Sequence, residues 1–186
     1  MAQAKNITTP LTDEVVSTLK CGDMVNISGV IYTGRDAAHK IMVDMIAKGE
    51  ELPVDWDGQV IYYAGPTPAK PGRVIGSCGP TTSGRMDAFS PTMMDQGLKG
   101  MIGKGPRSKE VVDAMVEHHV VYFAAVGGAA ALIADSVKEC EVIAFPDLGP
   151  EAVRRLRVEN YPCVVVIDAE GNNLYESGPA QYRIDE

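Results

Sequence analysis

The sequence predicts an α/β protein with a mixed sheet, and two features support this fold class. Segments with strand character and segments with helix character alternate along most of the 186 residues. The apolar run 120–126 has the composition of a buried strand, and the small-residue run 129–137 that follows it is typical of a helix. The length fits a single domain over 1–186 that is large enough to bury a real core.

Local signals predict the remaining elements. Polar residues placed to cap helices precede three helix-like runs: Thr12 before 13–20, Ser90 before 91–96 and Ser108 before 109–118. A further helix-like run over 37–50 ends at Gly49. Apolar patterns predict strands over 24–32, 59–64, 73–76, 99–103 and 142–145. Near the C-terminal end we expect a helix over 150–158 and a hairpin that pairs 163–168 with 173–176.

The charge of the chain excludes some partners. A net charge of −8 argues against nucleic acid or an anionic membrane surface as the main partner. The charge is unevenly spread, because Thr33 to Lys109 holds 10 Lys and Arg against 8 Asp and Glu, a net +2. The rest of the chain is therefore −10. This distribution is compatible with a local basic site for a small anion, although an evenly solvated surface gives the same count.

The cysteines predict neither a zinc site nor a self-contained iron–sulfur site. The four cysteines lie far apart and form no CxxC pair: Cys21, Cys78, Cys140 and Cys163. The N-terminal residues lack an apolar signal core, and no run approaches the length of a transmembrane helix. We therefore expect a cytoplasmic protein with free thiols.

The stretch CGPTTSGRMD at 78–87 is the strongest candidate for a site. It combines small hydroxyl residues and two glycines with one cation, Arg85, in a turn before a helix-like run. Arg35 and Lys104 also lie beside glycines where a strand gives way to a turn or helix. Ligands of α/β proteins gather at such strand ends, and two arginines with a lysine suit a small dicarboxylate. Taken singly, each cation is better explained as an exposed residue at a helix start.

Two other features are open to ordinary structural explanations. His39 lies one helical turn beyond Arg35 and could assist an anionic site or a proton transfer, but a lone helix histidine more often packs or faces solvent. Gly127 and Gly128 precede a small-residue run without the GxGxxG fingerprint of dinucleotide-binding proteins. We expect a close-packed helix start there.

Four motifs in order resemble those of one enzyme family: TGRDAAHK at 33–40, AGPTP at 64–68, GPTTSGRMD at 79–87 and KG at 104–105. With these motifs the chain resembles the β subunit of class I fumarate hydratases, which is equivalent to the C-terminal domain of the single-chain enzymes. The resemblance covers nearly the whole chain, including VVYFAAVGGAAAL and DAEGNNLY. Related L-tartrate dehydratases use the same type of subunit, but the first and third motifs look more like the fumarase versions.

The resemblance implies a swivelling β/β/α domain and an enzyme that reversibly hydrates fumarate to L-malate. It also implies an α subunit whose cysteines hold a 4Fe-4S cluster, in an α2β2 assembly that completes the active site. One iron of that cluster would bind the substrate as a Lewis acid. This chain alone would hold no cluster and would be inactive.

The resemblance also implies roles for individual residues. Arg35 and Arg85 would hold substrate carboxylate, and Lys104 would add a third cationic contact. Thr81 matches the threonine that acts as general base at C3 of the substrate, a demanding role because an alcohol is a poor base at neutral pH. His39 and Thr82 are candidate supporting residues.

Three alternatives remain open from the sequence. An L-tartrate dehydratase β subunit would share the fold and differ in substrate. A non-catalytic dicarboxylate-binding module would have the cations but would not need Thr81 beside them. A Rossmann-type oxidoreductase is disfavoured by the missing fingerprint.

Overall fold

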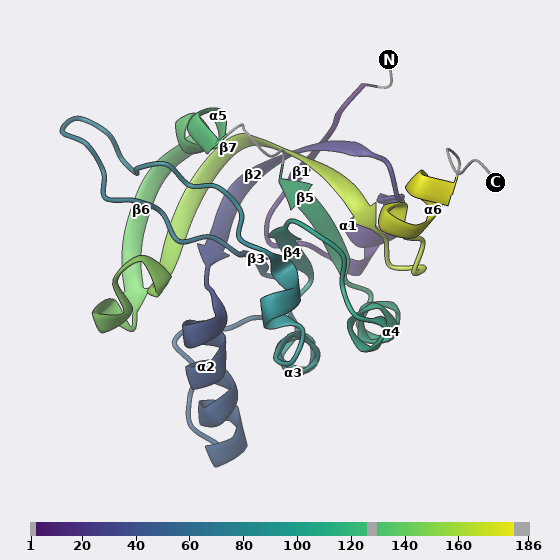
Figure 1. The fold of residues 1–186 in the computed structure, drawn as a ribbon, viewed down its shortest axis with the longest axis horizontal. Coiled ribbons are helices and arrows are strands. Elements are labelled where there is room, and N and C mark those ends of the chain that lie inside the picture. Colours follow the sequence, from purple (N-terminus) through teal and green to yellow (C-terminus); the bar gives the residue numbers. More distant parts are fainter. Residues whose placement is uncertain (1–2, 126–129, 181–186) are drawn as a thin grey trace, which may run out of the picture.

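The computed structural model describes residues 3–125 and 130–180. Its centre is a mixed sheet that closes on itself (Figure 1). Strands β2, β3, β4 and β5 run parallel in this order, and β7 runs antiparallel between β5 and β2. The predicted α/β class with a mixed sheet is confirmed. The strands are β1 Lys5–Thr8, β2 Met24–Thr33, β3 Val60–Tyr62, β4 Gly100–Gly103, β5 Val121–Ala125, β6 Val137–Ala144 and β7 Val153–Ile167.

The two longest strands close the barrel because each has neighbours on both edges. One edge of β2 pairs with β7 from residue 24 to residue 33, while its other edge pairs first with β1 and then with β3. The second edge of β7 is shared in the same way by β6 and β5. A register shift between Ile27 and Gly29 marks a bulge that bends β2 against β7.

The helices lie on more than one side of the barrel (Figure 1). Three of them, α2, α3 and α4, lie together below the sheet in this view, and α5 lies at the opposite side near β6 and β7. The helices are α1 Asp13–Thr18, α2 Asp36–Lys48, α3 Ser90–Asp95, α4 Lys109–His118, α5 Ala130–Ser136 and α6 Leu174–Ala180, with 3-10 turns η1 Ser83–Met86 and η2 Pro146–Glu151. No helix among these described residues is long and apolar enough to cross a membrane.

Alternation along the strands produces two cores. Buried side chains from one face of every barrel strand, such as Ile27, Tyr62 and Phe123, form one cluster. The neighbouring residues on β3, β4 and β5 point the other way and form a second cluster with α2, α3 and α4. Tyr63 and Tyr122 belong to this second cluster, which lies under the candidate site described below.

Several local predictions are confirmed. The Thr12 and Ser108 hydroxyls accept hydrogen bonds from Val15 and Val111 and cap their helices. Gly49 ends α2 with φ 70°, in the left-handed region that glycine adopts without strain.

The helix predicted over 150–158 is wrong, because this segment enters β7. Val153, Leu156 and Val158 are buried on β7, whereas Arg155 and Arg157 are more exposed. The spacing of apolar residues in the run RRLRV fits a helix or a strand. Pairing with β2 on one edge and β6 on the other makes it a strand.

Three smaller predictions also fail. Residues 73–76 form no strand but part of a long loop after β3, in which Ile75 is buried and Arg73 and Val74 are exposed. Ser90 does not cap α3; it is the first residue of that helix, and its buried hydroxyl donates to the carbonyl of Met86. The second strand of the closing hairpin is reduced to one bridge between Ile167 and Asn173, after which α6 begins. Gly127 and Gly128 lie outside the described residues.

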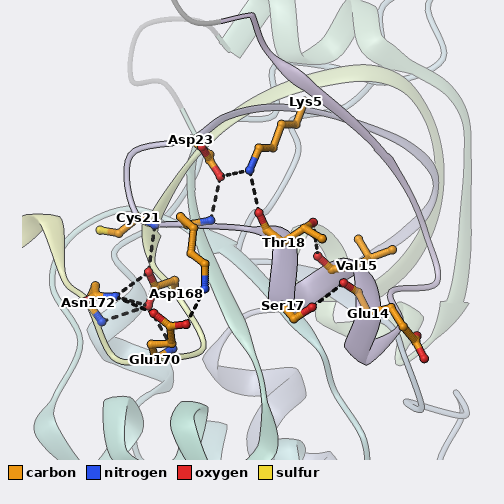
Figure 2. A network of polar contacts seen from close by, with 11 residues as sticks. Lys5, Glu14, Val15, Ser17, Thr18, Cys21, Asp23, Asp168, Glu170 and Asn172 are labelled. Carbon is orange, nitrogen blue, oxygen red and sulfur yellow. Dashed lines mark hydrogen bonds and ion pairs between the residues drawn. The ribbon is translucent and has the colours of Figure 1, made fainter.

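A polar network fastens the start of β2 to the end of β7 (Figure 2). The Asp168 carboxylate accepts hydrogen bonds from the backbone amides of Cys21, Glu170 and Asn172 and from the Asn172 side chain. Burial works against ionisation of Asp168, but these hydrogen bonds outweigh it and lower its pKa. The network lies at the opposite end of the barrel from the C-terminal ends of β2, β3 and β4.

Candidate functional site

The candidate site lies where the parallel strands β2, β3 and β4 end. Arg35 follows β2 by two residues, and Lys104 directly follows β4. The pairs Thr33–Tyr62 and Tyr62–Ile102 place these strand ends side by side. Neighbouring strands lie about 4.8 Å apart, so roughly 10 Å separates the backbones of Arg35 and Lys104. Two long cationic side chains can therefore reach one small ligand between them.

The predicted loop 78–87 lies between the extensions of β3 and β4. Pro80 forms an antiparallel bridge with Ala64, and the Thr81 amide donates to the Tyr63 carbonyl at 2.7 Å. Two residues on, Thr82 forms a parallel bridge with Lys104. The loop therefore pairs briefly with both strand extensions, and it brings Thr82, with Thr81 next to it, beside Lys104.

The functional groups of this loop and of Lys104 are available to a ligand. Arg85, Thr82 and Lys104 are exposed, and Thr81 is half-buried. Among the described residues, no side-chain hydrogen bond or ion pair engages the Thr81 hydroxyl, the Arg85 guanidinium or the Lys104 ammonium. Unneutralised cations beside a free hydroxyl attract a carboxylate, because no internal anion competes for them.

Arg35 is held differently from the other two cations. Its Nη2 lies 3.1 Å from Oε1 of Glu151 in η2, and 23% of its side chain is exposed. The guanidinium packs on Gly65, where an added Cβ would lie 3.2 Å from Nη1 of Arg35 and 3.2 Å from the carbonyl oxygen of Pro150. Gly65 therefore leaves room for the arginine, and Glu151 orients it. Sequence reasoning did not find Glu151, which lies 116 positions away from Arg35 in the chain.

His39 supports Arg35 from the buried side of the site. Its Nδ1 lies 2.8 Å from the carbonyl oxygen of Arg35, so this nitrogen must carry the proton and donate. Its Nε2 is buried without a partner among the described residues. Burial lowers the pKa of His39 to about 4, with the Arg107 charge acting in the same direction. A neutral, fully buried imidazole orients the backbone at Arg35 and does not touch a ligand at the surface.

The sequence did not identify Arg107, a buried arginine close to the site. Arg107 lies beneath the loop, with a fully buried side chain whose Nε contacts Oδ1 of Asp87 at 2.6 Å. Its guanidinium also lies over the rings of Tyr63 and Tyr122. The only sequence signal was the position of Asp87 two residues after Arg85 and of Arg107 three residues after Lys104.

Comparison with known proteins identifies the family. A family model described as "Fumarase C-terminus" matches residues 2–178. The chain belongs to this family. It is 42% identical over 172 residues to a Methanocaldococcus jannaschii protein named "Putative L(+)-tartrate dehydratase subunit beta", a match that covers 89% of this chain and 88% of that protein.

Fumarate hydratases match over a similar stretch. The chain is 38% identical over 174 residues to the anaerobic class I fumarate hydratase of Escherichia coli, and 41% identical over 156 residues to fumarate hydratase 2 of Leishmania major. These matches cover 92% and 83% of this chain but 31% and 28% of those proteins. This fumarase C-terminus family member therefore spans about a third of the length of these fumarate hydratases.

The residues of this family member do not fit an iron–sulfur cluster. Within 3–125 and 130–180, no three His, Cys, Asp or Glu side chains gather as a metal site would require. Cys78 and Cys163 are buried, and burial raises the pKa of the Cys78 thiol to about 12. A protonated, enclosed thiol is a poor nucleophile. Cys78 instead contributes its carbonyl, which accepts a 2.6 Å hydrogen bond from the Tyr62 hydroxyl.

Proposed function

We propose that this chain is the β subunit of a hydro-lyase that reversibly hydrates fumarate to L-malate. One observation carries the proposal: Thr81, Arg85 and Lys104 leave a hydroxyl and two cations unpaired at the strand ends where Arg35 also lies. Fumarate carries two carboxylates, and reversible hydration adds or removes one proton at one of the two carbons between them and a hydroxyl at the other. The site offers groups for both requirements.

Arg35 and Arg85 bind carboxylate oxygens in this proposal, and Lys104 adds a point charge. In the dehydration direction, the C3–H bond of malate breaks and its proton goes to the Thr81 alkoxide, the electron pair forms the C2–C3 double bond, and the C2–O bond breaks to release hydroxide. Return of the proton from Thr81 to this hydroxide gives water and restores the alkoxide. An alcohol accepts such a proton only in its alkoxide form. Arg85 and Lys104 are the cations that would stabilise that form.

A second protein surface is needed to enclose a ligand at this site. Arg85, Thr82 and Lys104 are exposed, so this chain covers only one side of a ligand. We assign the other side to an α subunit that holds the 4Fe-4S cluster, in an α2β2 assembly, because the described residues of this chain do not fit the cluster.

L-tartrate is the second candidate substrate. The Methanocaldococcus relative that matches over most of its length is named for it. Both substrates are small dicarboxylates, and both reactions remove water next to an abstracted proton. The motifs TGRDAAHK and TTSGRMD, which resemble the fumarase versions, favour fumarate.

The test is to purify the chain anaerobically with its α partner, reconstitute the cluster and assay fumarate and L-tartrate side by side. We expect fumarate turnover in the mixture and none with this chain alone. The exposed loop variant Arg73→Ala serves as a control, because it removes a cation away from the strand ends. Tartrate turnover alone would replace the substrate. Turnover of neither by an intact complex would leave a binding module as the better explanation.

A further inference from the structure

Arg107 is the most completely enclosed cation near the site. Its Nε contacts Asp87 at 2.6 Å, Nη2 donates to the Ser90 hydroxyl at 2.7 Å, and Nη1 faces the Met101 sulfur at 3.3 Å. The second oxygen of Asp87 accepts the backbone amide of Ser108 at 2.8 Å. Because Asp87 neutralises it and none of its side chain is exposed, Arg107 cannot bind substrate itself.

The two rings that flank Arg107 connect it to the site. Its guanidinium carbon lies 5.4 Å from the ring centre of Tyr63 and 5.1 Å from that of Tyr122. The backbone carbonyl of Tyr63 accepts the amide of Thr81 at 2.7 Å. Tyr63 therefore links Arg107 to Thr81, the proposed base.

Tyr122 links Arg107 to the segment 104–105, which contains Lys104. The Tyr122 hydroxyl lies 2.8 Å from Oγ of Ser83 and 2.9 Å from the carbonyl oxygen of Gly105. Ser83 in turn accepts the Lys104 amide at 3.0 Å through its hydroxyl, and its own amide donates to the Lys104 carbonyl at 2.9 Å. The loop 81–87 and the segment 104–105 therefore share one buried support.

We propose that Arg107 is a positioning residue that fixes the loop bearing Thr81 and Arg85 relative to Lys104. Resting on the proposed function, the inference is that this spacing sets both KM for the dicarboxylate and kcat. Asp87, Tyr63 and Tyr122 transmit the effect. The competing explanation is that Arg107 contributes only to the stability of the core.

Arg107→Lys separates these explanations in the reconstituted complex. Lysine keeps the charge opposite Asp87, but it cannot also bond Ser90 and lie flat over two rings. We expect the folded complex to lose at least tenfold in kcat/KM, with a raised KM and a lowered kcat. Arg157→Lys is the matched control, since this arginine pairs with Glu139 and Glu159 on the surface and should keep wild-type constants.

Tyr122→Phe tests whether Tyr122 couples Arg107 to the loop, because it keeps the ring beside Arg107. It removes only the hydroxyl between Ser83 and Gly105, and we expect a severalfold loss of kcat/KM in a folded protein. In both variants, hydrogen exchange at the amides of Ser83 and Lys104 should become at least tenfold faster. The Val165 amide, bonded to Asp23 at the other end of the barrel, should exchange as in wild type.

The outcomes separate the inference from the proposed function. Wild-type kcat and KM in folded Arg107→Lys would overturn the inference while the function stands, as would exchange that rises equally at Val165. If Arg107→Lys does not fold, wild-type exchange and kinetics in Tyr122→Phe overturn it. If the wild-type complex turns over neither dicarboxylate, the function fails, and the exchange results alone decide whether Arg107 holds the two segments together.

Discussion

We expect His39→Asn to remove a pH dependence of folding stability between about pH 6.5 and pH 4. In the folded chain, burial lowers the pKa of His39 from 6.5 to about 4. Nδ1 already donates to the Arg35 carbonyl, so an added proton would go to Nε2, which is buried without a partner among the described residues. Arg107 opposes this charge, and the more weakly acting Asp36 favours it.

The sign follows from the unfolded chain binding the proton more tightly. The contribution of neutral His39 to stability is fully present above pH 6.5 and is lost as the pH falls toward the folded pKa of about 4. With 1.36 kcal/mol for each pH unit between the two pKa values, the loss is about 2 kcal/mol at pH 5 and about 3 kcal/mol at pH 4. Carboxylates with lowered pKa values lose their contributions at lower pH, so pH 5 isolates the histidine.

The assay is urea unfolding of the chain at pH 7.5, 6, 5 and 4.5. Asn can place an N–H where Nδ1 donates, so His39→Asn keeps the bond to Arg35 but cannot titrate. We expect its unfolding free energy to be lower than wild type at pH 7.5 because the ring is lost, with the gap shrinking by about 2 kcal/mol at pH 5. The exposed His119, whose φ of 53° suits Asn, gives the control His119→Asn. A gap that stays constant with pH would refute the burial argument.

Three further perturbations address the site and the fold. Thr81→Ala should leave assembly intact and lower kcat by about 10²–10⁴-fold, the usual range for a general base; an unchanged kcat in steady-state assays would remove Thr81 from the proton transfer. Arg85→Lys should lower kcat/KM by about 10- to 100-fold despite the kept charge, because the bidentate contact is lost; Arg73→Lys is its control, and equal effects of the two would contradict the site. Asp168→Ala should lower the unfolding free energy by about 2–3 kcal/mol, since the network of Figure 2 loses its acceptor, yet leave kcat of the folded complex unchanged. A kcat that falls with Asp168→Ala would show that this end of the barrel is coupled to the site.

The strand ends at the site could be predicted from the sequence because their signals are local. Apolar runs followed by glycine mark where β2 and β4 stop, and the residues after such stops lie at one edge of a parallel sheet. Arg35 and Lys104 were found in this way. The loop 78–87 was found by its unusual mixture of small hydroxyls and a cation. All these signals lie within ten residues of the groups concerned.

The missed features depend on distant pairing. The run RRLRV became part of β7 because two partner strands need it, and neither partner is visible in the local pattern. Glu151 contacts Arg35 only because η2 folds back toward the end of β2. The position of Arg107 three residues after Lys104 did not predict its burial, because an arginine after a Gly-Pro pair is ordinarily solvated. Its burial follows from Asp87 and two tyrosines contributed by other elements.

The charge pattern of the site explains how an acidic chain can bind a dianion. Arg107 is matched by Asp87 and Arg35 by Glu151, whereas Arg85 and Lys104 have no partner among the described residues. A partner carboxylate fixes the geometry of the matched cations and offsets their charge, and the unmatched ones create the local attraction. The ligand's carboxylates then supply the missing partners of Arg85 and Lys104. Arg107 is enclosed and supports the backbone, Arg35 is oriented by Glu151 but stays partly exposed for a carboxylate, and Arg85 and Lys104 are open cations.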